Sequence, residues 1–224
     1  MANASTTGFG FVPVMNLGNT PATSGESKYK IKTGLGIAIV QNDPVSLQSS
    51  VGDEGYVQDA SPATCDDGST GGASYDVDTS PVLTGPLIGV FNGAFYIANT
   101  TNKPTWANNV AASTTFAANP NTDGNSTDGF AFVNDNPFQE YICKADLAVT
   151  ILMTARRMNC NNNTLSSAVS GQSVVTLNIT GDDNGFMWRL LRSAEDPSNN
   201  DVSAVGCNVI VVGSARANLF LQDK

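Results

Sequence analysis

Residues 82–97 constrain the fold of this chain more than any other part of the sequence. They read Val-Leu-Thr-Gly-Pro-Leu-Ile-Gly-Val-Phe-Asn-Gly-Ala-Phe-Tyr-Ile, so a dense apolar and aromatic run is interrupted by glycine and proline. Helices avoid these residues in their interiors, whereas strands accept them at bulges and where two backbones approach closely. We therefore expect this run to form the central strand region of a β protein.

A second run of the same character covers residues 130–143, where Asn-Asp-Asn-Pro at 134–137 divides two aromatic segments. The span between the two runs, residues 99–128, is polar and rich in Asn, Thr, Ser and Pro. This arrangement predicts two hydrophobic strand regions joined by a long excursion over the surface.

Shorter segments elsewhere also have the composition of strands. Residues 28–32 alternate Lys with Tyr and Ile, and a period of two places the three lysines on one face of a strand. Asn-Asp-Pro at 42–44 predicts a turn. Further strands are expected at residues 34–40, 148–153, 174–179, 186–192 and 209–212, with a possible extension at 217–221.

The resulting pattern is about eight to ten short strands without a long amphipathic helix, which favours an antiparallel β-sandwich, jelly roll or β-barrel. A chain of 224 residues fits one such domain. We assign residues 28–224 to this domain and residues 1–27 to an extended N-terminal arm. The arm carries aromatic and apolar anchors among small residues, and we expect it to dock on another chain.

The composition argues against several classes of function. The chain has no histidine, which excludes Ser-His and Cys-His catalysis and any His-ligated metal. Its net charge of −9 opposes binding to phosphate backbones, so no nucleic-acid partner is expected. Charged residues make up 14% of the chain, below the usual level of about 25%. A surface of this kind suits a loop-rich β protein with extensive protein contacts, and we expect neither enzymatic activity nor a cofactor.

The four cysteines, Cys65, Cys143, Cys160 and Cys207, are interpreted as small buried hydrophobic residues, and the sequence selects no disulfide pairing among them. Residues 121–127 carry oxygen-bearing side chains at alternate positions, as in the first half of a calcium loop. However, Phe132 stands where a bidentate Glu is needed, so no metal is expected.

The N-terminal sequence has neither a basic start nor an apolar core, so no secretory signal is expected. No apolar run approaches the roughly 18 residues that cross a bilayer. We therefore expect a soluble protein made in the cytoplasm, with no membrane partner.

A set of short segments occurs in a recognisable order along the chain. The segments are Gly-Phe-Gly-Phe-Val-Pro-Val at 8–14, Gly-Val-Phe-Asn-Gly at 89–93, Phe-Tyr at 95–96, Lys-Pro-Thr-Trp at 103–106, Ala-Phe-Val at 131–133, Asp-Asn-Pro-Phe at 135–138 with Glu140, and Leu-Leu-Arg-Ser-Ala-Glu-Asp-Pro-Ser-Asn at 190–199. Their order resembles that of virion proteins of tailed phages, especially cyanophages and marine phages. The resemblance implies an auxiliary head protein, a cement or decoration subunit on the outer surface of the capsid.

This resemblance leads to a structural hypothesis in which the chain binds the major capsid protein of a phage head. A homo-oligomer is expected, and a trimer would suit local three-fold positions of the shell. The residues expected to bind the partner are Phe9, Phe11, Met15, Lys28, Lys30 and Lys32.

The alternative hypothesis is a carbohydrate-binding or receptor-binding β module of a phage tail or surface, in which Trp106 or Trp188 serves as a platform for a sugar. A hydrolase would need two carboxylates facing each other across a cleft. Most carboxylates of the chain stand in Gly- and Ser-rich segments that favour turns, so this reading is disfavoured.

Overall fold

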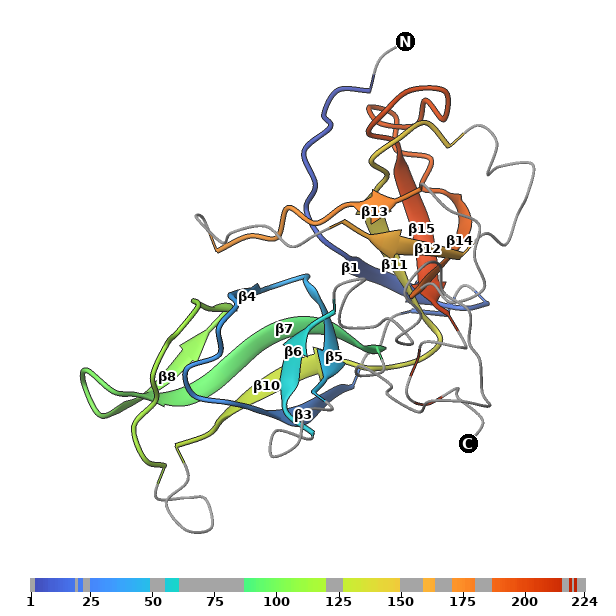
Figure 1. Cartoon of the computed structure of the whole chain (residues 1–224). Coiled ribbons are helices and arrows are strands. Elements are labelled where there is room, and N and C mark those ends of the chain that lie inside the picture. The colour runs from blue at the N-terminus through green and yellow to red at the C-terminus, as the bar shows by residue number, and fades with distance from the viewer. Residues whose placement is uncertain are drawn as a thin grey trace, which may run out of the picture.

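The computed structural model shows two antiparallel sheets, each with its own hydrophobic core (Figure 1). The residues that it describes contain strands and turns and no helix, which confirms the prediction of an all-β fold. None of them therefore belongs to a helix able to cross a membrane. The described residues are 3–18, 20–21, 25–48, 55–60, 87–119, 127–149, 159–163, 171–179, 187–214, 218 and 220.

The first sheet has seven strands in the order β13-β12-β14-β15-β11-β1-β2. A bridge between Ala145, which follows β11, and Leu177 of β13 curls the sheet back on itself. The buried side chains enclosed by this curl include Phe11, Tyr141, Trp188 and Val211. The strands are β1 (Val12–Asn16), β2 (Thr20–Pro21), β11 (Gln139–Lys144), β12 (Asn159–Asn162), β13 (Leu177–Asn178), β14 (Trp188–Ser193) and β15 (Asn208–Gly213).

The second sheet has the order β3-β10-β7-β5-β6, and β8 pairs with the second half of β7. Lys30 of β3 forms a bridge with Tyr56, next to β6, so this sheet also curls toward a barrel. A separate short pair, β4 (Ile39–Val40) with β9 (Asn109–Val110), lies beside it. The six strands are β3 (Glu26–Ile31), β5 (Pro44–Leu47), β6 (Val57–Asp59), β7 (Leu87–Ala98), β8 (Lys103–Ala107) and β10 (Gly129–Asn134).

Strand β7 is the central strand that residues 82–97 predict, although residues 82–86 lie outside the described part. Leu87 and Val90 pack in the first core, whereas Ile88 and Phe91 pack in the second. One strand therefore contributes to both cores. The expected bulge is present, because Asn92 of β7 is an extra residue opposite the register shift between Phe132 and Val133 of β10.

Gly89 shows why glycine interrupts this strand. A Cβ atom at position 89 would collide with the backbone carbonyl oxygen of Asn134. Only a residue without a side chain allows β7 and the end of β10 to come this close. The predicted close approach of two backbones is thus confirmed at this position.

Several local predictions are also confirmed. The second run folds into β10 and β11, separated by a turn at 135–138, and residues 186–192 contribute to β14. In the turn at 42–44, Asn42 has a φ of 72° and the Asp43 carboxylate accepts a hydrogen bond from the Val40 N–H at 2.9 Å. Asparagine tolerates this left-handed backbone conformation better than most residues.

Other predicted strands are shorter than expected. Of residues 34–40 only β4 is a strand. Gly34 lies in a turn with a φ of 72°, and its N–H donates to the carbonyl of the distant residue Thr114. Of residues 174–179 only β13 is a strand, and residues 148–149 are not part of one. Residues 150–153, most of 217–221, Cys65 and most of the calcium-like segment lie outside the described residues.

The N-terminal segment is not a separate arm. Strand β1 pairs with β11 on one side and with β2 on the other, so it lies inside the first sheet. The Phe11 ring is fully buried and stacks on the Trp188 ring, with centroids 4.3 Å apart and planes inclined by 15°. The boundary expected between residues 27 and 28 therefore does not separate two structural units, since residues 11–16 complete the first core and its sheet.

Replacing Phe11 with Ala should lower the free energy of unfolding by about 3–5 kcal/mol, the usual cost of removing a buried aromatic ring. Urea unfolding of the two proteins measures this difference. Val14→Ala is the matched control, because Val14 lies nearby in β1 but is 37% exposed, and its cost should stay below about 1 kcal/mol. Equal stability of Phe11→Ala and the parent protein would restore the idea of a dispensable arm.

Candidate functional site

The outer face of the second sheet carries a row of exposed or half-buried aromatic and basic side chains. In β3 the Ile31 side chain is fully buried while Lys28 and Lys30 are exposed, which confirms the predicted alternation. Lys30 lies opposite Phe130 of β10 in the strand register. Opposite residues in neighbouring strands share one face of a sheet. The lysines therefore stand beside aromatic rings.

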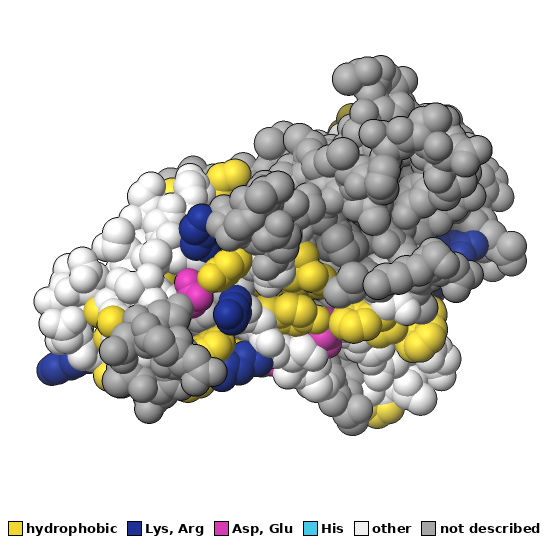
Figure 2. Space-filling view, turned by 60° about the horizontal axis from the view of Figure 1, so that its bottom comes forward, with side chains coloured by type: hydrophobic (Ala, Val, Ile, Leu, Met, Phe, Trp, Pro, Cys, Tyr) yellow, Lys and Arg dark blue, Asp and Glu magenta, His cyan; other side chains and the backbone are white. Residues whose placement is uncertain are grey.

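The strand register extends this row across four strands. Phe130 lies opposite Phe95 of β7, and Phe95 lies opposite Trp106 of β8. Figure 2 shows basic side chains grouped with hydrophobic ones on the underside of the molecule. We call this surface the aromatic–lysine face and define it by Lys28, Lys30, Phe95, Trp106, Phe130 and Phe132.

Contacts within the aromatic–lysine face hold its side chains in place. The Lys28 ammonium lies 3.5 Å from the centre of the Phe130 ring, a cation–π contact. The Trp106 ring centroid is 4.8 Å from that of Phe95 and 5.3 Å from that of Phe132, and the planes of Trp106 and Phe132 differ by 23°. Trp106 nevertheless remains 70% exposed, so the packed rings leave a large apolar surface open to solvent.

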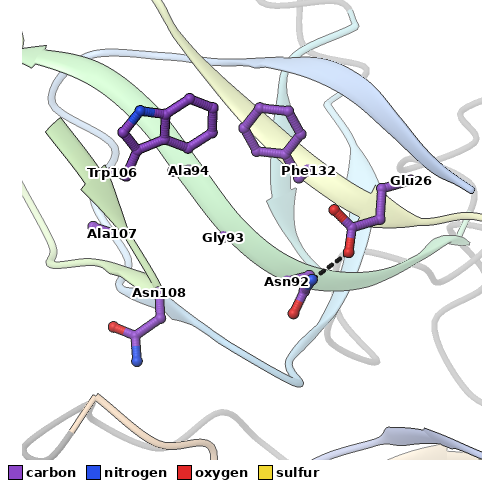
Figure 3. A pocket seen from close by; sticks show the side chains of 8 residues that line it. All are labelled: Glu26, Asn92, Gly93, Ala94, Trp106, Ala107, Asn108 and Phe132. Carbon is purple, nitrogen blue, oxygen red and sulfur yellow. Dashed lines mark hydrogen bonds between the residues drawn. The ribbon is translucent and has the colours of Figure 1, made fainter. Parts of the chain in front are cut away.

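A shallow hollow of about 440 Å³ opens beside Trp106 (Figure 3). Gly93 lies opposite Phe132 in the register and has no side chain to fill this space. Asn92, on the β7 bulge, donates a hydrogen bond to the Glu26 carboxylate and accepts one from the Gln41 amide at 2.8 Å. The hollow is lined by Glu26, Asn92, Gly93, Ala94, Trp106, Ala107, Asn108 and Phe132.

The residues that the sequence assigned to partner binding are not gathered in one place. Lys28 and Lys30 lie on the aromatic–lysine face, next to half-buried Lys32. Phe9 is half-buried with the Lys144 ammonium 5.8 Å from its ring centre, and Met15 is half-buried with its Sδ 3.7 Å from Arg192. Phe9 and Met15 therefore lie at the first sheet and not on the aromatic–lysine face.

Phe11 must be withdrawn from the predicted binding residues, because its side chain has no exposed surface. Trp188 must be withdrawn as a sugar platform for the same reason, since it is fully buried between Phe11 and Tyr141. Trp106 is exposed, as the hypothesis of a sugar platform requires.

Among the described carboxylates none belongs to a metal centre, and Asp196 shapes a turn. Within the described ranges no group of three or more Cys, Asp or Glu side chains is arranged to hold a metal ion. Asp196 accepts hydrogen bonds from the Ser198 N–H and from the Asn199 and Asn208 side chains, which lower its pKa. This is the turn-forming role that its sequence context predicts.

Three of the cysteines, Cys143, Cys160 and Cys207, are buried, and Cys143 and Cys207 are free thiols. Burial raises the pKa of the Cys143 thiol well above its usual value, which keeps it in the unreactive thiol form. The interpretation as small hydrophobic residues is confirmed for these three positions, and Cys65 lies outside the described residues.

Comparison with known proteins gives no similar relative: no protein-family model, no curated protein and no solved structure matches the chain.

The row of rings was missed in the sequence, although the alternation Lys-Pro-Thr-Trp-Ala at 103–107 and Gly-Phe-Ala-Phe-Val-Asn at 129–134 contains its signal. The second segment places Phe130 and Phe132 on one face with a period of two, and the first places Trp106 on one face of its strand. The same residues could equally well face the core. Since aromatic residues are common in strand interiors, alternation alone does not say which face is buried.

A buried carboxylate lies where the β4–β5 turn meets the two sheets. Asp43 has 1% exposed surface, and burial raises its pKa to about 6, with the nearby charge of Asp59 adding to this effect. Hydrogen bonds from Ser173 and from the Val40 N–H oppose the rise only in part. Folding therefore works against the charged form of Asp43.

The pH dependence of the protein's stability should reflect the raised pKa of Asp43. Because its folded pKa of about 6 exceeds the ordinary value of 3.8, the folded state binds more protons between these values, and the free energy of unfolding should fall as the pH rises from about 4 to 7. Asp43→Asn keeps an acceptor for the Val40 N–H but does not titrate. The variant should gain stability relative to the parent over this range, on the order of 2 kcal/mol. Urea unfolding curves at several pH values test this, and parallel pH profiles would contradict it.

Proposed function

We propose that this protein is a cement subunit of a tailed-phage head, which binds the outside of the assembled shell through its aromatic–lysine face. The observation that carries the proposal is this face itself: packed rings spread over β10, β7 and β8, with exposed lysines along β3. Rings that are already held by their neighbours lose little conformational freedom on binding, and Trp is frequent among residues that dominate interfaces. The face thus has the composition of a protein-docking surface.

The charge distribution supports a protein partner with an acidic docking surface. The chain carries a net charge of −9 with only eleven basic residues, yet Lys28 and Lys30 stand together on β3. A local basic stripe on an acidic protein directs binding to an acidic patch, while the overall charge opposes attachment to nucleic acid. The major capsid protein is the partner in this proposal, and the bound location is the outer surface of the capsid.

The proposed activity is mechanical, without a catalytic step. A subunit that contacts more than one shell protein adds contact energy that must be lost before those proteins separate. This linkage exists only on the lattice, so the subunit should prefer assembled heads to isolated shell protein. A trimer fits the proposal because a closed symmetric oligomer can occupy a local three-fold position of the shell.

Reversing the charges of Lys28 and Lys30 to Glu should weaken attachment to heads. Exposed ion pairs contribute about 0–1 kcal/mol each, so the double variant should bind about 3–30-fold more weakly at low salt and approach the parent at high salt. Co-sedimentation with purified heads gives the occupancy, and thermal disruption of the same heads gives the rupture temperature. Heads carrying the parent protein should rupture at a higher temperature than bare heads.

Lys103→Glu is the matched control, because Lys103 is an exposed lysine of the same sheet but lies at the start of β8, away from the β3 stripe. It should leave attachment unchanged. Circular dichroism establishes that both variants are folded. Full retention of the double variant at low salt would refute docking through the lysines. Equal rupture temperatures at full occupancy would remove the cementing role.

A further inference from the structure

We propose that the hollow beside Trp106 binds a neutral sugar, with the indole ring as the platform for one pyranose face. This inference goes beyond attachment to the shell and does not depend on it. It commits to a neutral glycan because the geometry of the rings and the polar groups around them suit that ligand better than the alternatives.

The exposed indole ring suits the face of a sugar. A pyranose presents a face of slightly positive C–H groups, which is attracted to the negative face of an aromatic ring. Trp106 offers such a face, since it is 70% exposed and its ring is packed against those of Phe95 and Phe132. A platform fixed before binding avoids the entropic cost of ordering a free indole.

The arrangement of the rings does not suit a cationic ligand. A quaternary ammonium group is bound in a cage, where rings surround the cation. Here the centroids of Trp106 and Phe132 are 5.3 Å apart and their planes are inclined by only 23°. Rings stacked at this distance leave no room for a cation between them, so they do not form a cage.

Polar groups line the hollow beside the indole ring. The Asn92 amide donates to the Glu26 carboxylate and accepts from Gln41, so this chain of hydrogen bonds fixes the orientation of both Asn92 and Glu26. The second carboxylate oxygen of Glu26 and the exposed Asn108 amide add acceptor and donor capacity on the lining of the hollow. Carboxylate and amide groups match the hydroxyl groups of a sugar, which donate and accept in turn.

The size of the hollow also suits a sugar. A hollow of about 440 Å³ is within the range of small-molecule sites, about 300–1,000 Å³. Trp106 is on β8, three strands away from the lysines on β3, which corresponds to about 14 Å at the usual spacing of strands. Trp106 and the lysine stripe therefore lie at opposite ends of the aromatic–lysine face.

The experiment uses the full chain and a panel of oligosaccharides of glucose, galactose, mannose and N-acetylglucosamine. The chain has two tryptophans, and Trp188 is fully buried, so a change of fluorescence on titration reports mainly on Trp106. We expect at least one neutral sugar of the panel to bind with a Kd below about 10 mM. Trp106→Ala should weaken that binding at least tenfold when it is measured by calorimetry, and Asn92→Ala should weaken it severalfold.

Phe138→Ala is the control, because Phe138 is a 53% exposed ring in the turn between β10 and β11 and does not line the hollow. It should leave sugar binding unchanged. Failure of every neutral sugar to bind below about 10 mM overturns the proposal. It is also overturned if only an anionic polysaccharide binds in a salt-sensitive way, or if only a tetraalkylammonium ion binds. Because binding is measured without phage heads, failure here is distinct from failure of the cement proposal.

Discussion

The structure depends on one strand that is shared by two cores. Leu87 and Val90 of β7 are buried in the first core, whereas Ile88, Phe91 and Ala94 are buried in the second. A strand usually buries one face and leaves the other to solvent. Here the side chains on both faces of the first residues of β7 are buried, and the backbone of β10 approaches closely at Gly89. The outer face of β7 becomes accessible to solvent only beyond the bulge at Asn92.

This change along β7 creates the candidate site. Beyond the bulge, Gly93 and Phe95 turn toward the outer side of the sheet, while Ala94 continues in the second core. The row of rings that follows is a consequence of strand pairing, because each ring stands opposite the next across the ladder. The site is therefore built on regular strands, which position side chains more rigidly than loops do.

Sequence reasoning located the elements that have a strong local signal. The alternation in β3 and the apolar runs of β7, β10 and β15 can be recognised from the residues of each strand alone. It was less successful where the outcome depends on distant partners. Phe11 is buried because β14 brings Trp188 against it, and the turn at Gly34 is held by a hydrogen bond from the Gly34 N–H to the distant Thr114 carbonyl. For the same reason the sequence could not tell that Trp106 is exposed and Trp188 buried.

The curling of both sheets affects how copies of the protein can contact one another when they are crowded. A free sheet edge offers unpaired N–H and C=O groups to any neighbouring chain, and such edges promote aggregation. The bridge from Lys30 to Tyr56 brings the two borders of the second sheet together, and the bridge from Ala145 to Leu177 joins β13, a border of the first sheet, to the residue after β11. On β8, Lys103 contributes a charge and Pro104 lacks an N–H, and both features discourage further strand addition. Crowded copies would thus meet through their side chains, and a surface of that kind can change its partner by substitution without any change to the backbone beneath it.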